Sequence, residues 1–363
     1  MPSQAVSTQN QNLFSPITIG KLQLPNRIIM APLTRNRAGE GNVPQAMGVT
    51  YYEQRATAGL IITEASQVSP EGVGYPATPG IHSPEQIEGW KKVTDAVHAK
   101  GGHIFLQLWY CGRISHPSLL PEGQLPVAPS AIKPDGEAFT YTGLQPFVEP
   151  RALTLADIPG ILDQFRQAAI NAKLANFDGV EVHAANGYLI DQFLRDGTNQ
   201  RDDQYGGSLE NRARLLMQTI EAVTEAWDAG QVGVRISPEN GFNDIRDSQP
   251  QVTFNYVAKA LSDKGLAYLH VVEGDMVNGE RNLDYRQIKD QFKGPYMANC
   301  GYTLDKGQAA LADGDADMVS FGSLYIANPD LVERFSSDAE LNTPDQSTFY
   351  GGDEHGYTDY PSL

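Results

Sequence analysis

The stretch Gly179-Val-Glu-Val-His-Ala-Ala-Asn-Gly-Tyr-Leu-Ile-Asp-Gln-Phe-Leu194 changes character near its middle. Up to His183, valines alternate with polar residues, as side chains alternate along a β-strand. After the break at Ala185-Asn186-Gly187, the apolar residues are spaced like one face of a helix. The stretch therefore predicts a strand whose end presents a His, an Asn and a Tyr before a helix begins.

The same order of strand and helix recurs along the whole chain, which is the pattern of a parallel α/β sheet. Eight such units predict a (β/α)8 TIM barrel, and such barrels often exceed 300 residues as one domain, so we expect a single domain over 1–363. The expected strands are 28–33, 60–68, 103–110, 179–185, 232–238, 268–274, 295–302 and 318–324. The expected helices are 44–58, 84–100, 154–176, 208–228, 252–264, 285–292, 304–313 and 329–336.

Four segments lie outside this repeat, one of which is the C-terminal tail at 351–363. Residues 16–24 predict an N-terminal hairpin that caps the bottom of the barrel, and residues 1–12 a loose tail. Residues 111–151 are rich in Pro and Gly and follow the third strand. Because loops after barrel strands lie over the active-site mouth, we expect this insertion to be a lid.

Composition excludes several classes of function. The formal net charge of -17 disfavours nucleic acid as a partner, and no apolar run is long enough to span a membrane. The start lacks the features of a signal peptide, and the two cysteines fit a reducing cytoplasm and are too few for an iron–sulfur cluster with four Cys ligands. The seven histidines show no metal-ligand spacing, so we expect no metal site.

Two expected strands carry polar side chains that point into the barrel. Gln107 and Trp109 share a face of the third strand, and Arg235 lies on the inward face of the fifth. A buried guanidinium needs hydrogen-bond acceptors. Either an internal carboxylate such as Glu181 pairs with Arg235 or an electron-rich ligand does, and the residues alone leave both open.

The ends of the first, seventh and eighth strands have features of a phosphate or cofactor site. The first ends at Ala31-Pro32-Leu33-Thr34, and Gly301 and Gly322 follow the other two. Loops after the last two strands often bind phosphate in barrels, because glycine lets backbone N–H groups approach the oxygens. The competing interpretations are a turn-capping hydroxyl for Thr34 and ordinary tight turns for the glycines.

His183, Asn186 and Tyr188 are candidate catalytic residues. Each alone is explained by structure: a core histidine, a turn asparagine and an interfacial tyrosine. Together they form two hydrogen-bonding groups and a phenol, which can hold an oxygen anion and deliver a proton, since a phenol with a pKa of about 10 is protonated at pH 7. We expect the Asn186 half of this anchor to be insensitive to pH and the His183 half to titrate.

Several ordered motifs make the chain similar to the old yellow enzyme family of FMN-dependent ene-reductases over nearly its whole length. Its ending, from Phe349 to Pro361, resembles bacterial nitrate-ester and enone reductases of that family. The motifs are Asn26-Arg27-Ile28 with 31–35, Thr63-Glu64-Ala65, Gln107-Leu108-Trp109, 183–189, 202–212, 234–238 and Asn328-Pro329-Asp330-Leu331.

This resemblance implies that FMN is bound non-covalently across the barrel mouth. Thr34 would hydrogen-bond the flavin, Gln107 and Arg235 would bind its pyrimidine edge, and the loops at Gly301 and Gly322 would hold its phosphate. The implied cofactor-binding residues are Pro32, Leu33, Thr34, Ala65, Gln107, Arg235, Gly301, Gly322 and Ser323.

The implied reaction is reduction of the C=C bond of α,β-unsaturated carbonyl or nitro compounds by NADPH or NADH in two half-reactions at one site, with nitrate esters or other nitro compounds as further substrates. His183 and Asn186 would anchor the substrate oxygen and Tyr188 would protonate the α-carbon. Trp109 and Tyr350 would contact substrate. We expect a monomer or homodimer.

One departure from the family pattern concerns Ser323. Many relatives carry an Arg directly after the Phe-Gly of the eighth strand, where it helps to bind the FMN phosphate. We expect FMN binding to survive, because one charged contact contributes about 1.5–3 kcal/mol. The alternative function is a non-redox TIM-barrel enzyme acting on a phosphorylated substrate, which would leave Gln107, Trp109 and Arg235 without a role.

Overall fold

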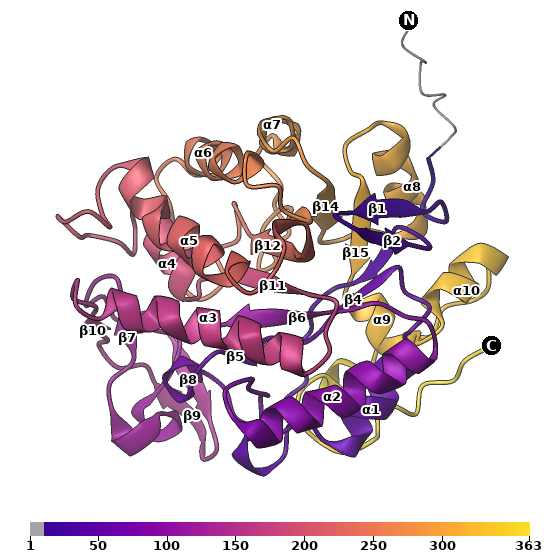
Figure 1. Cartoon of the computed structure of the whole chain (residues 1–363), viewed down its shortest axis with the longest axis horizontal. Helices are drawn as coiled ribbons and strands as arrows, with labels where there is room; N and C mark the ends of the chain where they lie inside the picture. The colour runs from indigo at the N-terminus through magenta and orange to yellow at the C-terminus, as the bar shows by residue number, and fades with distance from the viewer. Residues whose placement is uncertain (1–10) are drawn as a thin grey trace, which may run out of the picture.

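The computed structural model describes residues 11–363, so nearly all of the tail expected at 1–12 lies outside the described residues. The described chain forms a closed parallel barrel with helices around the outside (Figure 1). The barrel strands are β3 (Ile28–Met30), β4 (Leu60–Ile62), β5 (Ser66–Gln67), β6 (Ile104–Trp109), β11 (Gly179–Ala184), β12 (Val232–Ile236), β13 (Tyr268–Val272), β14 (Tyr296–Asn299) and β15 (Met318–Phe321).

Closure comes from the pairing of β6 with both β4 and β11, while β15 pairs with β3 on the other side. Since β4 and β5 share one position beside β6, the barrel has the eight positions that the sequence predicted. The helices are α1 (Ala46–Glu53), α2 (Pro84–Ala99), α3 (Ile158–Leu174), α4 (Leu189–Leu194), α5 (Leu209–Thr224), α6 (Pro250–Ser262), α7 (Tyr285–Gln291), α8 (Leu304–Ala312), α9 (Ser323–Ala327) and α10 (Leu331–Ser337). No helix of residues 11–363 is long and apolar enough to cross a bilayer.

The N-terminal hairpin closes the amino end of the barrel, as predicted. Its strands β1 (Ile17–Ile19) and β2 (Leu22–Leu24) pair antiparallel. Ile19 and Leu24 are fully buried in a cluster with Ile29, Phe105 and other inward-facing side chains of the barrel. Burial of these residues seals one end, so ligands can reach the barrel only from the carboxyl ends of the strands.

The second strand is shorter than the predicted 60–68 because its middle leaves the ladder. Glu64 binds residues outside the sheet: its backbone N–H donates to the hydroxyl of Tyr52 at 2.9 Å, and its carboxylate accepts the backbone N–H of Arg35 at 3.2 Å. In the segment that separates β4 from β5, these contacts take the place of hydrogen bonds to a neighbouring strand. They hold Ala65, which is 4% exposed, at the barrel mouth.

The insertion after β6 has structure of its own. It contains β7 (Val127–Ala128), paired in parallel with β10 (Arg151–Ala152), and an antiparallel hairpin of β8 (Glu137–Thr140) and β9 (Gly143–Pro146). Ala138 and Phe147 of this insertion pack in one cluster with Trp109 and Tyr188. The predicted lid segment therefore lies against the aromatic residues at the strand ends.

Candidate active site

Three predicted residues meet at the carboxyl ends of β6 and β11. The ring of Tyr188 lies edge-on to Trp109, with 4.9 Å between centroids, and edge-on to His183, with 5.1 Å. His183 ends the alternating part of β11, and Tyr188 directly precedes α4. The change from strand to helix read from the sequence thus brings these side chains together.

Tyr75 completes this aromatic cluster and was not predicted. Its ring stacks on Trp109 with centroids 5.6 Å apart, and its hydroxyl accepts a hydrogen bond from Tyr188 at 3.1 Å. Tyr75 lies in an irregular segment between β5 and α2. Periodicity cannot place a residue of such a segment, so the only signal for Tyr75 was an aromatic side chain close to Gly72 and Gly74.

Burial fixes the protonation states of the two titratable candidates. It raises the pKa of Tyr188 well above 10, with a further contribution from Tyr75, so the phenol keeps its proton. Burial, together with the positive charge of Arg235, lowers the pKa of His183 well below 6.5. The lowered pKa favours the neutral imidazole near pH 7.

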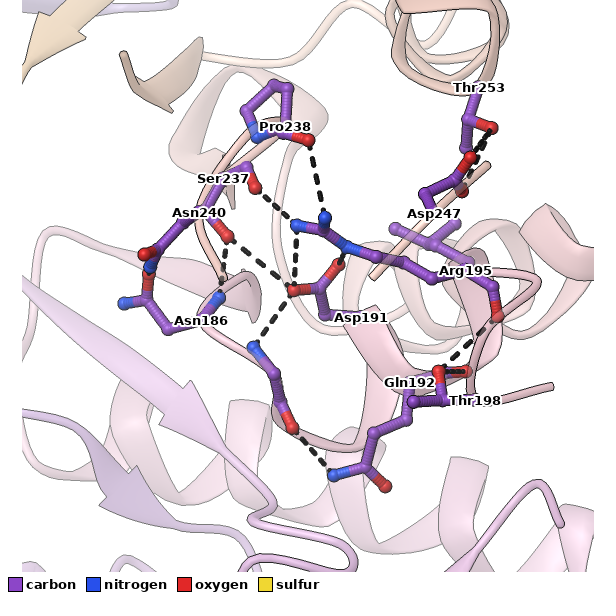
Figure 2. Close-up of polar contacts among 12 residues, drawn as sticks. Asn186, Asp191, Gln192, Arg195, Thr198, Ser237, Pro238, Asn240, Asp247 and Thr253 are labelled. Atoms are coloured by element: carbon purple, nitrogen blue, oxygen red, sulfur yellow. Dashed lines mark hydrogen bonds and ion pairs between the residues drawn. The ribbon is translucent and has the colours of Figure 1, made fainter. Parts of the chain in front are cut away.

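The turn that carries Asn186 is held by a buried polar network (Figure 2). Asn186 has a left-handed backbone with φ of 57°, and its N–H donates to Ser237 Oγ at 2.7 Å. The next N–H, of Gly187, donates to Asp191 Oδ2 at 2.9 Å. Asp191 in turn accepts from Arg195 at 2.8 Å, and both side chains are buried. The network fixes the turn between β11 and α4 against the end of β12.

Gln107 and Arg235 lie on the inward face, as predicted, with different partners. Gln107 Nε2 donates to Glu181 Oε1 at 2.7 Å, which leaves its amide oxygen as an acceptor for a ligand. Glu181 also bonds His270. Burial alone would raise the pKa of the Glu181 carboxyl, but the interaction with His270 outweighs it, and the pKa is lowered. His270 and Ser320, which continue this chain of hydrogen bonds at 2.7 Å, were missed because each falls inside an apolar run.

Within residues 11–363, Arg235 and Glu181 form no ion pair with each other. One end of its guanidinium donates to Asn299 Oδ1 at 2.9 Å, and its Nε is buried without a hydrogen-bond partner in residues 11–363. A buried guanidinium N–H without an acceptor is costly, so Arg235 is arranged for an electron-rich ligand. A flavin pyrimidine edge, which carries carbonyl oxygens and ring nitrogens, fits this donor.

The predicted phosphate loops follow β14 and β15 and include exposed residues. Gly301 has φ of 67°, and a Cβ added there would meet nothing within 4 Å. Gly322 connects β15 to α9, and Ser323, the first residue of α9, is exposed. The stretch Pro32-Leu33-Thr34 follows β3, the strand that pairs with β15. These residues suit a phosphate and an isoalloxazine ring between the ends of β3, β14 and β15.

Tyr350 is less closely associated with the cluster than the other candidates. Its side chain is 66% exposed, in a C-terminal segment that returns to the barrel through Arg35, whose guanidinium donates to Phe349 O at 2.9 Å. Tyr350 therefore lies near the rim of the site.

Comparison with known proteins agrees with this geometry. The profile of the NADH:flavin oxidoreductase / NADH oxidase family matches residues 12–342. A 12-oxophytodienoate reductase 1 of Oryza sativa subsp. japonica is 45% identical over 100% of this chain and 96% of its own length. The solved structure of a morphinone reductase has a TM-score of 0.95 and 50% identity, covering 99% of this chain and 98% of the other.

A second solved structure, of the old yellow enzyme homologue from Zymomonas mobilis, has a TM-score of 0.94 and 46% identity over 97% of this chain and 100% of the other. These matches give no support to a non-redox barrel enzyme acting on a phosphorylated substrate. The chain belongs to the NADH:flavin oxidoreductase / NADH oxidase family, and within it to the old yellow enzymes, which use FMN and a nicotinamide to reduce enones.

Proposed function

We propose that His183 and Asn186 form the anchor for the substrate oxygen and that Tyr188 is the proton donor in this ene-reductase. The observation that carries the proposal is the packing of the His183 ring against the Tyr188 ring, 5.1 Å between centroids, at the end of β11, with Asn186 in the turn between them. An enone or nitroalkene places its oxygen on two such donors and its α-carbon near a third. Each group then has one chemical task.

The anchor works by donating hydrogen bonds where negative charge develops. A neutral His183 donates from one ring nitrogen, and Asn186 donates from its amide. As the β-carbon is reduced, the substrate oxygen becomes enolate-like, and both donors bind it more strongly than they bind the ketone. Since neither group loses a proton, the anchor stabilises charge without titrating.

Tyr188 supplies the proton that completes saturation of the double bond. Its raised pKa keeps the hydroxyl protonated until a basic enolate carbon accepts the proton. The hydrogen bond to Tyr75 orients the hydroxyl within the aromatic cluster. Trp109, which stacks between Tyr75 and His183, shapes the pocket wall, and we propose Tyr350 as an outer substrate contact at the rim.

The cofactor side of the site is formed by residues of other strand ends. Gln107 would accept a hydrogen bond from the flavin ring, Arg235 would stabilise negative charge on its pyrimidine edge, and Thr34 would bind a ring carbonyl. FMN, when bound, supplies the hydride that a nicotinamide has delivered. The remaining proposed contacts are Pro32, Leu33 and Ala65 beside the ring and Gly301, Gly322 and Ser323 at the phosphate.

The names of the relatives suggest the class of substrate: both 12-oxophytodienoate and morphinone reductases are named for enones within rings. We propose cyclic enones as substrates here, with nitro compounds and nitrate esters as further ones. The solved complex of morphinone reductase with tetrahydroNAD, 49% identical to this chain, supports a nicotinamide at the same mouth. A cytoplasmic location, a single domain, a monomer or homodimer and no nucleic-acid partner stay predictions from the sequence, with its net charge of -17.

The proposal is tested by the visible spectrum during turnover. The FMN-loaded protein should be yellow, bleach anaerobically on addition of NADPH or NADH, and regain its colour on addition of 2-cyclohexenone. His183→Ala and Asn186→Ala should bleach but regain colour slowly. Variants that regain colour with 2-cyclohexenone as fast as the parent would refute the anchor role. A parent protein that regains colour with oxygen but not with 2-cyclohexenone would refute ene reduction.

A further inference from the structure

Asn240 lies behind the proposed anchor, in the turn that follows β12 (Figure 2). Its side chain is fully buried. Its Nδ2 donates to Asn186 Oδ1 at 3.0 Å, while its Oδ1 accepts the backbone N–H groups of Phe242 at 3.3 Å and Met276 at 3.4 Å. It is therefore a polar side chain whose bonds connect two backbone donors to one anchor residue.

These contacts determine which way both amides face. A backbone N–H can only donate, so the atom of Asn240 that faces Phe242 and Met276 must be its oxygen. Its nitrogen then faces Asn186, and a nitrogen donor requires the oxygen of Asn186 as its acceptor. Within residues 11–363, Asn186 Nδ2 donates no hydrogen bond to a protein group, and this nitrogen is not fully buried. It remains as the free donor of that side chain.

We infer that Asn240 is a positioning residue that fixes the amide of Asn186 with its N–H group toward the substrate oxygen. This role rests on the anchor function proposed for Asn186. An asparagine amide can turn by about 180° at small steric cost, because its oxygen and nitrogen are nearly the same size. Turned that way, Asn186 would present a carbonyl oxygen to a developing oxyanion and repel it.

The turn carrying Asn186 is independently fixed, so the amide orientation is the degree of freedom left for Asn240. The backbone N–H of Asn186 binds Ser237, and its backbone carbonyl accepts from Asn243 Nδ2 at 2.8 Å. Loss of the Asn240 side chain therefore leaves these two backbone bonds of the turn in place. It releases the Asn186 amide, together with the N–H groups of Phe242 and Met276.

The test compares Asn240→Asp with Asn240→Ala in the FMN-loaded protein, using p-hydroxybenzaldehyde as an oxyanion probe and the flavin spectrum to measure its Kd. At about pH 8 the new carboxylate accepts rather than donates, so it turns the Asn186 amide around, and we expect Kd to rise about tenfold or more. In Asn240→Ala the amide populates both orientations, and Kd should rise about twofold. A merely structural role predicts the reverse order, because alanine leaves a cavity and aspartate does not.

A double-mutant cycle separates amide orientation from direct repulsion by the new charge. In an Asn186→Ala background, Asn240→Asp should have no further effect on Kd. An undiminished effect there, or a parent-like Kd for Asn240→Asp alone, would overturn the positioning role. Failure of the proposed function looks different: His183→Ala and Asn186→Ala would then leave the Kd for the probe unchanged. FMN content and Tm of each variant report whether the fold is retained.

Discussion

The hydroxyl of Tyr188 donates a hydrogen bond to the hydroxyl of Tyr75, with 3.1 Å between the two oxygens. Both phenols have a pKa raised by burial, so each keeps its proton at neutral pH. Burial acts on His183 in the opposite direction and lowers the pKa of its imidazole well below 6.5. The substrate half of the site therefore has no group that changes its charge near pH 7.

This arrangement predicts a flat pH profile for reoxidation. The imidazole is already neutral above its lowered pKa, and the phenol is still protonated below its raised pKa. The rate constant for reoxidation of the pre-reduced enzyme by 2-cyclohexenone, which does not ionise, should stay constant between about pH 6.5 and 9. Stopped-flow absorbance measures it. A transition centred near pH 6.5 would show that His183 titrates as an ordinary histidine.

Removal of one anchor donor should weaken the binding of phenolic ligands. In His183→Ala, the bond between the imidazole and a bound phenolate is lost, at a cost of about 1.5–3 kcal/mol, or roughly ten- to 100-fold in Kd. Spectral titration with p-hydroxybenzaldehyde gives the value. His103→Ala, which removes a histidine directly before β6, at the amino end of the barrel and opposite the site, serves as the matched control and should leave Kd unchanged.

The resemblance to the old yellow enzymes implies that Ser323 faces the FMN phosphate at a position that is often Arg, so Ser323→Arg should strengthen FMN binding. A charge-assisted contact to the phosphate predicts a fall in the Kd for FMN of about tenfold to 100-fold. Fluorescence quenching of added FMN measures the affinity of the apoprotein. Ser336→Arg, at an exposed position on α10, adds the same charge elsewhere and should have little effect. Equal effects of the two substitutions would mean that Ser323 does not face the phosphate.

Because of Glu64, the free energy of unfolding should fall as the pH rises. Burial raises its pKa from 4.5 to about 7, so the folded state binds a proton that the unfolded state has lost. The folded protein therefore loses up to about 3 kcal/mol of stability between pH 4.5 and 7. Glu64→Gln should remove this loss, so that its stability relative to the parent increases with pH in urea unfolding. Glu88→Gln, on the exposed face of α2, is the control, and a constant difference for Glu64→Gln would refute the shift.

Residue patterns predicted the barrel because each strand and helix is encoded locally. The alternation in 179–183 and the inward parity of Gln107 and Arg235 placed site residues at strand ends, where β6, β11 and β12 do meet. Tyr75 and Asn240 could not be found in this way. Both lie in irregular segments, and their partners Tyr188 and Asn186 are distant in sequence. The break between β4 and β5 was missed for the same reason, since Glu64 at the break bonds Tyr52 and Arg35, which are 12 and 29 residues away in sequence.

The most direct measurement of the central claim is a comparison of the two half-reactions in Tyr188→Phe. Removal of the hydroxyl takes away the proton donor and leaves the ring contacts with Trp109 and His183. Anaerobic stopped-flow should show bleaching by NADPH at nearly the parent rate and reoxidation by 2-cyclohexenone slowed about 100-fold or more. Equal slowing of both half-reactions, or unchanged reoxidation, would contradict the assignment of Tyr188 as the proton donor.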